Sequence, residues 1–120
     1  MTPPRLFVYG TLQDDELVRR LTGRRLAWRP AVLEGYARAV DPVVGYPVVR
    51  PRHGAAVDGR ILEDVGPDAL AAFDAYEGDE YRRTTVRVRT ADGHTIEAYV
   101  YIPASAVSAQ QPQGVPAGYD

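Results

Sequence analysis

The chain contains no cysteine and no lysine, and it has only two histidines among its 120 residues. Without cysteine there is no disulfide framework, no thiol nucleophile and no thiolate metal site. Without lysine the chain cannot form a Schiff base with a carbonyl substrate. His53 and His94 lie in no recognisable metal-ligand motif, so the sequence gives no support for a metal centre.

Strong charge and long apolar runs are also missing. The formal net charge of −2 creates no field that would recruit nucleic acid or an anionic membrane. No run approaches the length of a membrane span, and the first residues lack the apolar core of a signal peptide, so we expect a cytoplasmic protein. Hydrophobic residues make up 45% of the chain and charged residues 25%, as in a soluble globular domain.

The segment "RLFVYGTLQDD" at residues 5–15 stands out. Its apolar run 6–9 has the composition of a buried strand, and the strand breaks at Gly10 before an acidic, helix-opening stretch. Such a turn leaves backbone N–H groups without partners, and these could cradle a carboxylate or an oxyanion. It could equally be an ordinary strand-to-helix turn in which Gly10 supplies backbone freedom.

The rest of the chain alternates between extended and helical patterns. The clearest helix is "GPDALAAFDAYEG", in which Pro67 suits the first position and Gly78 the end. "ADG" between two β-rich runs predicts a hairpin. In the first half of the chain we expect a helix over 14–21, an extended segment over 25–40, and a loop and short edge strand over 41–51. A strand over 55–65 should be broken or bulged near Gly59, and two further strands are expected over 81–90 and 95–102. This α+β pattern predicts a small barrel or curled sheet with two short helices, forming one domain over 1–102 with a Pro/Gly/Gln-rich tail over 103–120.

Glu77 is the most informative single residue. Leu70, Phe73 and Glu77 are spaced i, i+3 and i+7, so they share one stripe of the predicted helix. A carboxylate on the core-facing stripe is costly unless it is paired or neutral. The helix could have frayed by Glu77, or Arg82 or Arg83 could neutralise it. Alternatively, Glu77 is a general base whose pKa is raised by partial desolvation.

Several motifs occur in an order that resembles a known family. They are "LFVYGTL" at 6–12, "LEGYA" at 33–37, "GYPVV" at 45–49, "VDGRILEDV" at 57–65, "AFDAYEGDEYRRTTVRV" at 72–88 and "AYVY" at 98–101. Together they resemble the γ-glutamylcyclotransferase-like family, in particular its short branch of γ-glutamylamine cyclotransferases and avirulence-induced plant relatives. An ordered set over roughly residues 5–102 is far more specific than any single motif.

The resemblance implies a small mixed β-barrel with flanking short helices, and it assigns roles to individual residues. Glu77 matches the family's catalytic glutamate. The family's substrate loop falls on Tyr9, Gly10, Thr11 and Leu12. Two further tyrosines, Tyr46 beside Pro47 and Tyr101 on the last strand, are candidate pocket walls, although half-buried tyrosines are commonly ordinary packing residues.

The implied reaction converts a small γ-glutamyl compound into 5-oxoproline and a free amine, without a cofactor and without a nucleic-acid or membrane partner. The leaving amine is open: a γ-glutamyl-ε-lysine crosslink, a small γ-glutamylamine and a γ-glutamyl-protected biosynthetic intermediate all fit. We expect a monomer or weak dimer. One alternative is a catalytically idle ligand-binding relative. Another is nucleic-acid binding through Arg83, Arg87 and Arg89, which the acidic net charge and the lack of interleaved aromatic residues disfavour.

Overall fold

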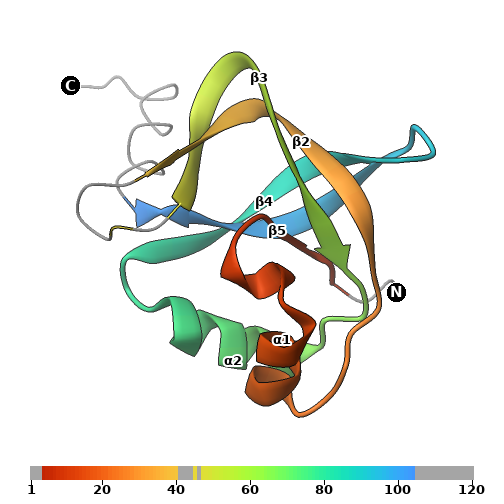
Figure 1. Ribbon diagram of the computed structural model, residues 1–120, viewed down its shortest axis with the longest axis vertical. Coiled ribbons are helices and arrows are strands. Elements are labelled where there is room, and N and C mark those ends of the chain that lie inside the picture. The colour runs from red at the N-terminus through yellow and green to blue at the C-terminus, as the bar shows by residue number, and fades with distance from the viewer. Residues whose placement is uncertain (1–3, 41–44, 46, 105–120) are drawn as a thin grey trace.

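The structure is a computed structural model that describes residues 4–40, 45 and 47–104. Five strands and two α-helices follow one another along this part of the chain, with one 3₁₀ turn, η1, after the first strand (Figure 1). The elements are β1 (Leu6–Val8), η1 (Thr11–Gln13), α1 (Asp15–Thr22), β2 (Trp28–Val40), β3 (Pro47–Leu62), α2 (Pro67–Glu77), β4 (Tyr81–Thr90) and β5 (Thr95–Pro103).

The strands close into a barrel in the order β1-β3-β2-β4-β5. All neighbours are antiparallel except β1 and β5, which run parallel and meet at Leu6 and Tyr99. The sheet is therefore mixed, as the resemblance implied, and β1 is the strand that completes it. Although β1 is only three residues long, it is hydrogen-bonded on both sides and fully buried.

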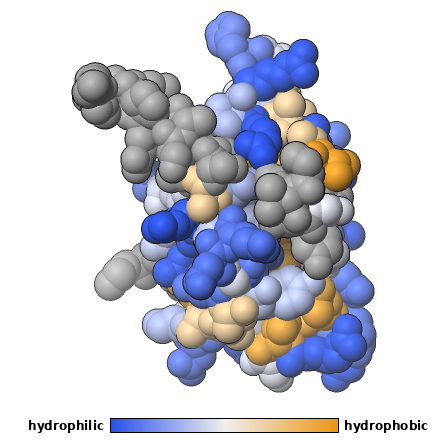
Figure 2. Space-filling view, turned by 90° about the vertical axis from the view of Figure 1, so that its left-hand side faces the viewer, coloured by the Kyte–Doolittle hydropathy of each residue, from blue (hydrophilic) through white to orange (hydrophobic). Residues whose placement is uncertain are grey.

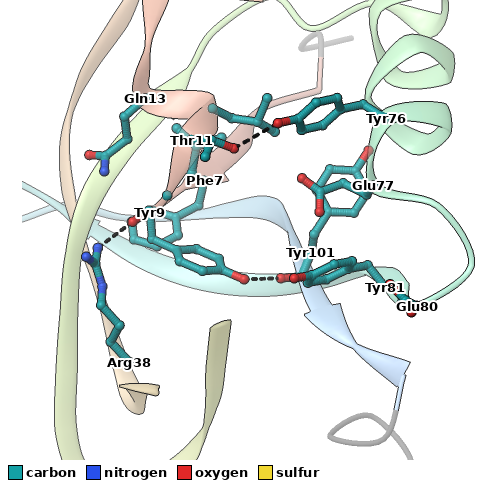
Figure 3. Close-up of a pocket in the computed structure, with 13 residues that line it drawn as sticks. Phe7, Tyr9, Thr11, Gln13, Arg38, Tyr76, Glu77, Glu80, Tyr81 and Tyr101 are labelled. Atoms are coloured by element: carbon teal, nitrogen blue, oxygen red, sulfur yellow. Dashed lines mark hydrogen bonds between the residues drawn. The ribbon is translucent and has the colours of Figure 1, made fainter. Parts of the chain in front are cut away.

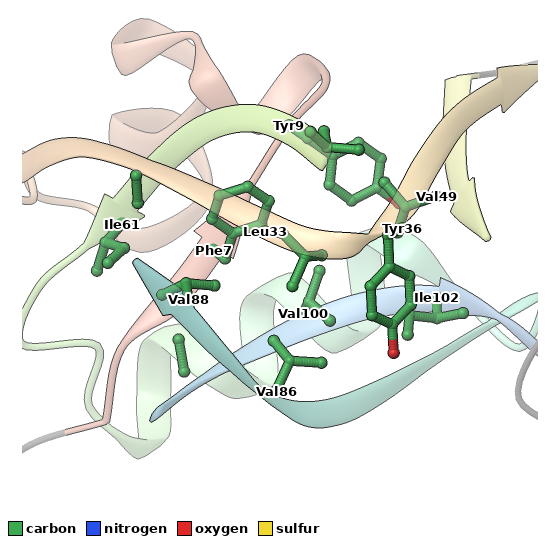
Figure 4. Packing of buried hydrophobic residues seen from close by; sticks show 13 residues of the cluster. Phe7, Tyr9, Leu33, Tyr36, Val49, Ile61, Val86, Val88, Val100 and Ile102 are labelled. Atoms are coloured by element: carbon green, nitrogen blue, oxygen red, sulfur yellow. The ribbon is translucent and has the colours of Figure 1, made fainter. Parts of the chain in front are cut away.

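Alternation along β1 places its side chains in two separate cores. Phe7 points into the barrel, where it packs with Leu33, Val88 and Val100 (Figure 4). Leu6 and Val8 point to the other face, toward the helices, where Phe73 of α2 is fully buried. A strand with apolar residues at consecutive positions is covered on both faces, which explains why this run shows no polar alternation.

The two helices lie next to each other at one end of the barrel (Figure 1). The Asp14 side chain caps α1 by accepting a hydrogen bond from the Glu16 N–H, and Gly23 ends the helix with a φ of 80°. Pro67 occupies the first turn of α2, and Gly78 follows its last residue. The expected helix boundaries are confirmed to within a residue. Within the described residues no helix is long and apolar enough to cross a membrane.

The expectation for the middle of the chain was wrong. Instead of a short edge strand and a second strand bulged at Gly59, one long strand, β3, runs from Pro47 to Leu62 and pairs with β2. The irregularity lies where residues 52–55 face the single Gly35 of β2. Gly35 and Gly54 both have positive φ values, 86° and 83°, which a glycine adopts without strain. The bulge therefore needed these two glycines and not Gly59.

Gly59 instead allows two strands to approach closely. A Cβ added at Gly59 would lie 2.3 Å from the Val8 carbonyl oxygen and 2.7 Å from Cζ of Phe7. No side chain fits in that space, so the glycine lets β1 and the Phe7 ring lie directly against β3. This close contact holds the strand that leads into the loop at Gly10.

The face of the molecule seen in Figure 2 is predominantly polar. Figure 2 shows a largely hydrophilic face, with apolar surface exposed mainly toward its lower end. Along β4, Val86 and Val88 point inward while Arg87 and Arg89 are exposed, and Arg89 forms an ion pair of 2.7 Å with Glu34 of β2. These two arginines lie on the outer face of the barrel, as expected for a strand face in contact with solvent.

Candidate active site

A pocket of about 590 Å³ opens between the end of β1 and the C-terminal end of α2. Its volume is within the range of small-molecule sites. Figure 3 shows its walls, which come from the loop after β1, from α2 and the turn that follows, and from β2 and β5. The lining residues are Phe7, Val8, Tyr9, Gly10, Thr11, Leu12, Gln13, Arg38, Tyr76, Glu77, Glu80, Tyr81 and Tyr101.

The structure places Glu77 at the last position of α2, with its side chain lining the pocket (Figure 3). The helix is intact through this residue. A frayed helix end therefore does not explain why a carboxylate is tolerated on the core-facing stripe. Arg83 lies elsewhere: it contacts Asp74 at 3.5 Å and stacks over the ring of Tyr99. The ion pairs among the described residues include none to Glu77, so no arginine neutralises it there.

Burial changes the acidity of Glu77. Removal of the carboxyl group from water disfavours its charged form and raises its pKa from 4.5 to about 7. Near neutral pH the group is therefore divided between its acid and its carboxylate, so it can both accept and return a proton. A general base on the core-facing stripe of α2, one of the alternatives that the helical spacing left open, would need this acidity.

Tyr101 forms the wall beside Glu77 and is held from both ends. Its hydroxyl donates a hydrogen bond of 2.6 Å to Oδ1 of Asp74, one turn before Glu77 on α2. Its backbone carbonyl accepts a hydrogen bond of 2.8 Å from the hydroxyl of Tyr9. Burial and the neighbouring carboxylate both raise the pKa of Tyr101, so its hydroxyl stays protonated. Because that proton is used by Asp74, the contribution of Tyr101 to the pocket is its ring.

The loop after β1 supplies backbone donors. In η1 the Gln13 N–H donates to the Gly10 carbonyl and the Asp14 N–H to the Thr11 carbonyl, each at 3.0 Å. The backbone N–H groups of residues 10–12 are donors in none of the hydrogen bonds found within the described chain. Space around Gly10 is open, because a Cβ added there would meet no atom within 4 Å. A ligand can therefore approach this backbone closely.

Of the expected site residues, the structure brings together Glu77, the loop and Tyr101: all of them line this pocket. The loop members are Tyr9, Gly10, Thr11 and Leu12. The remaining candidate wall, Tyr46, lies outside the described residues.

Sequence reasoning missed several residues of the pocket. Arg38 enters it from β2 and donates a hydrogen bond to the Tyr9 carbonyl oxygen (Figure 3). Tyr76 lies at the rim, where its hydroxyl is 3.2 Å from Oγ1 of Thr11. The helical register of α2 could have suggested Tyr76, which directly precedes Glu77. No local signal marks Arg38, because it reaches the pocket only through closure of the barrel.

The barrel fold is shared with solved γ-glutamyl cyclotransferase structures. One, titled gamma-glutamyl cyclotransferase, superposes with a TM-score of 0.74 over 84% of this chain and 66% of its own, at 18% identity. A mouse AIG2-like protein matches over 100% of this chain and 90% of its own with a TM-score of 0.73, at 21% identity. At these identities the likeness shows the fold. An Arabidopsis thaliana solution structure gives a TM-score of 0.80 at 29% identity, over 88% of this chain and 72% of that chain.

The chain belongs to the gamma-glutamyl cyclotransferase, AIG2-like family, whose model matches residues 6–119. AIG2-like protein C of Arabidopsis thaliana is 36% identical over 99 residues, which cover 80% of this chain and 58% of that protein. A gamma-glutamylcyclotransferase and putative RNase of Methanocaldococcus jannaschii is 30% identical over 99 residues, or 81% of this chain and 45% of that protein. Across the first three plant relatives the chain spans 58–61% of their length.

Proposed function

We propose that the pocket catalyses the cyclisation of a γ-glutamyl amine to 5-oxoproline with release of the free amine. The observation that carries the proposal is Glu77, a carboxyl group with a pKa near 7 in the same pocket as the backbone donors of residues 10–12. Membership of the gamma-glutamyl cyclotransferase, AIG2-like family supports this reaction class.

The reaction requires proton transfer and orientation but no water. The α-amine of the γ-glutamyl unit attacks its own γ-carbonyl carbon, which forms the new C–N bond of a five-membered lactam. Glu77 takes the proton that the attacking nitrogen loses. As the bond to the leaving nitrogen breaks, Glu77 returns a proton to that nitrogen, so the carboxylate is restored at the end of the cycle.

Backbone donors suit the charge that develops during this attack. The γ-carbonyl oxygen becomes an oxyanion in the tetrahedral intermediate, and fixed N–H groups stabilise an oxyanion without having to reorganise. We assign this role, or the binding of the α-carboxylate, to the N–H groups of residues 10–12. The ring of Tyr101 and the apolar body of Tyr9 exclude water and keep the substrate folded, which is most of what an intramolecular reaction needs.

The direct test is product formation. The purified protein is incubated with a panel of γ-glutamyl amines, γ-glutamyl dipeptides and γ-glutamyl-ε-lysine, and 5-oxoproline is quantified by mass spectrometry. The matched controls are Glu77→Gln, which removes the base, and Glu97→Gln, which changes an exposed glutamate of β5. We expect product with the wild type and with Glu97→Gln only. Binding of the panel compounds without any 5-oxoproline would refute catalysis and leave a ligand-binding domain.

A further inference from the structure

Two arginines hold the loop that carries the backbone donors, one at each end. Arg38 of β2 donates a hydrogen bond to the Tyr9 carbonyl oxygen, just before Gly10. Arg60 of β3 donates a hydrogen bond of 2.8 Å from Nη1 to the Gln13 carbonyl oxygen, at the end of η1. Both contacts connect segments far apart in the sequence, so they exist only in the closed barrel.

The contact at Tyr9 determines where the next N–H group points. In a trans peptide group the carbonyl and the following N–H point in opposite directions. The guanidinium of Arg38 attracts the Tyr9 carbonyl to its own side, so the Gly10 N–H is directed away from Arg38. Figure 3 shows Arg38 and Glu77 on opposite sides of Tyr9, which is the arrangement needed for the Gly10 N–H to face a substrate held beside Glu77.

The contact at Gln13 is made by an arginine that is itself held in place. The guanidinium of Arg60 lies 3.8 Å from the ring centroid of Trp28, and its Nη1 is 3.9 Å from Oδ1 of Asp15. Trp28 is 41% exposed, which is unusual for a large aromatic residue, and its ring covers the guanidinium. Arg60 does not line the pocket, so it can act on a bound substrate only through the loop.

Within the loop itself little restrains these peptide groups. Two hydrogen bonds of a single 3₁₀ turn close it, and the N–H groups of residues 10–12 are left for a ligand. A short 3₁₀ turn has poor hydrogen-bond geometry and does not by itself fix the orientation of the peptides before it. Oxyanion stabilisation nevertheless depends on donors that are already aligned before the reaction.

We propose that Arg38 and Arg60 are a pair of positioning residues that clamp the carbonyls at the two ends of this loop and so align its N–H groups. We call them the carbonyl clamp. The expected effect of the carbonyl clamp on kinetics rests on the proposed cyclotransferase function. Its expected effect on the loop conformation is independent of that function.

Steady-state kinetics test the catalytic part. Arg60→Gln removes the charged donor from a residue outside the pocket, and Arg87→Gln on the outer face of β4 is the matched control. We expect Arg60→Gln to lower kcat about ten- to a hundredfold, because small misplacement of aligned groups is costly, while KM changes less than about twofold. Arg60→Lys keeps a donor and should restore part of the loss. Unchanged kcat in Arg60→Gln would overturn the proposal.

Arg38 lines the pocket, so its variant separates positioning from direct substrate binding. Arg38→Gln should lower kcat with little change in KM if Arg38 acts through the Tyr9 carbonyl. A large rise in KM with unchanged kcat and an unshifted Gly10 amide would mean that Arg38 binds the substrate itself, and the clamp would then be refuted at this end.

Nuclear magnetic resonance tests the clamp without any substrate. The nitrogen shift of an amide reports on the hydrogen bonding of the carbonyl before it. We therefore expect the Gly10 amide to shift in Arg38→Gln and the Asp14 amide to shift in Arg60→Gln, while Arg87→Gln moves neither. Unchanged loop resonances in both variants would refute the clamp. If the wild type turned over no γ-glutamyl compound, the proposed function would fail, and these shifts would still decide whether the loop is clamped.

Discussion

Replacement of Glu77 by glutamine should make the protein inactive and more stable at the same time. The amide keeps the shape of the side chain but cannot accept the proton of the attacking amine, so we expect turnover to fall about a hundredfold or more. The gain in stability follows from the cost of holding an ionised carboxylate in the pocket wall. That cost appears as the raised pKa of about 7 against an ordinary value of 4.5.

Each pKa unit corresponds to about 1.4 kcal/mol, so the shift sets an upper limit of about 3 kcal/mol. Because the side chain keeps contact with solvent, we expect a gain of about 1–2 kcal/mol in the free energy of unfolding. The size of this gain depends on pH. The folded state binds the proton more tightly than the unfolded state, so the wild type loses stability as the pH rises from about 4.5 to about 7. Above that window the difference between variant and wild type stays constant.

Urea unfolding of both proteins at pH 4, 6 and 8 measures this difference, and Glu97→Gln serves as the exposed control. The stability advantage of Glu77→Gln should be near zero at pH 4 and largest at pH 8. In parallel, kcat/KM of the wild type should rise with pH through about 7 as the base ionises. An advantage that is equal at all three pH values would show that the carboxyl group is not desolvated. Wild-type turnover in the folded variant would refute its role as the base.

Three further outcomes follow from the glycines and from the mechanism. Gly10→Val should impair all γ-glutamyl substrates to a similar degree, measured as kcat/KM, because the protein leaves open space there for a side chain that would occupy the place of the ligand. Wild-type rates in this variant would contradict the loop assignment. Gly59→Ala should cost about 1–3 kcal/mol or more in urea unfolding, since its Cβ would overlap the Val8 carbonyl. Gly66→Ala meets no atom within 4 Å, so it should cost no more than the weaker N-cap of α2, about 1 kcal/mol. Prolonged EDTA treatment should leave turnover unchanged; activity that is lost and then restored by one defined ion would show a metal requirement.

The part of the candidate site that could be predicted from the sequence depends on local geometry. The spacing of Leu70, Phe73 and Glu77 fixes a common helix face whatever the rest of the fold does, and the structure has the helix intact over all three. The same holds for the end of β1, where a buried run meets Gly10. Both signals lie within a dozen residues of sequence, so no knowledge of strand pairing was needed.

The parts that sequence analysis missed depend on pairing between distant strands. Three prolines near the start of β3 made this region look like a loop and a short edge strand, yet its pairing with β2 extends over almost its whole length. Local propensity for a strand is weak evidence, because packing against neighbours decides the outcome. Arg38 and Arg60 reach the loop only through this β2–β3 pairing, so their contacts could not be read from either strand alone.

The parallel contact between β1 and β5 has a consequence for the order in which the parts of the molecule fold. The hydroxyl of Tyr9 reaches the carbonyl of Tyr101 across 92 positions of the chain, so one wall of the pocket follows β1 and another lies on β5. Closure of such a long loop is slow relative to the formation of α2 or the β4–β5 hairpin. Until β5 docks, we expect α2 to be formed with Glu77 exposed to solvent and with an ordinary pKa. During refolding, recovery of turnover should therefore never precede the docking of β5 against β1.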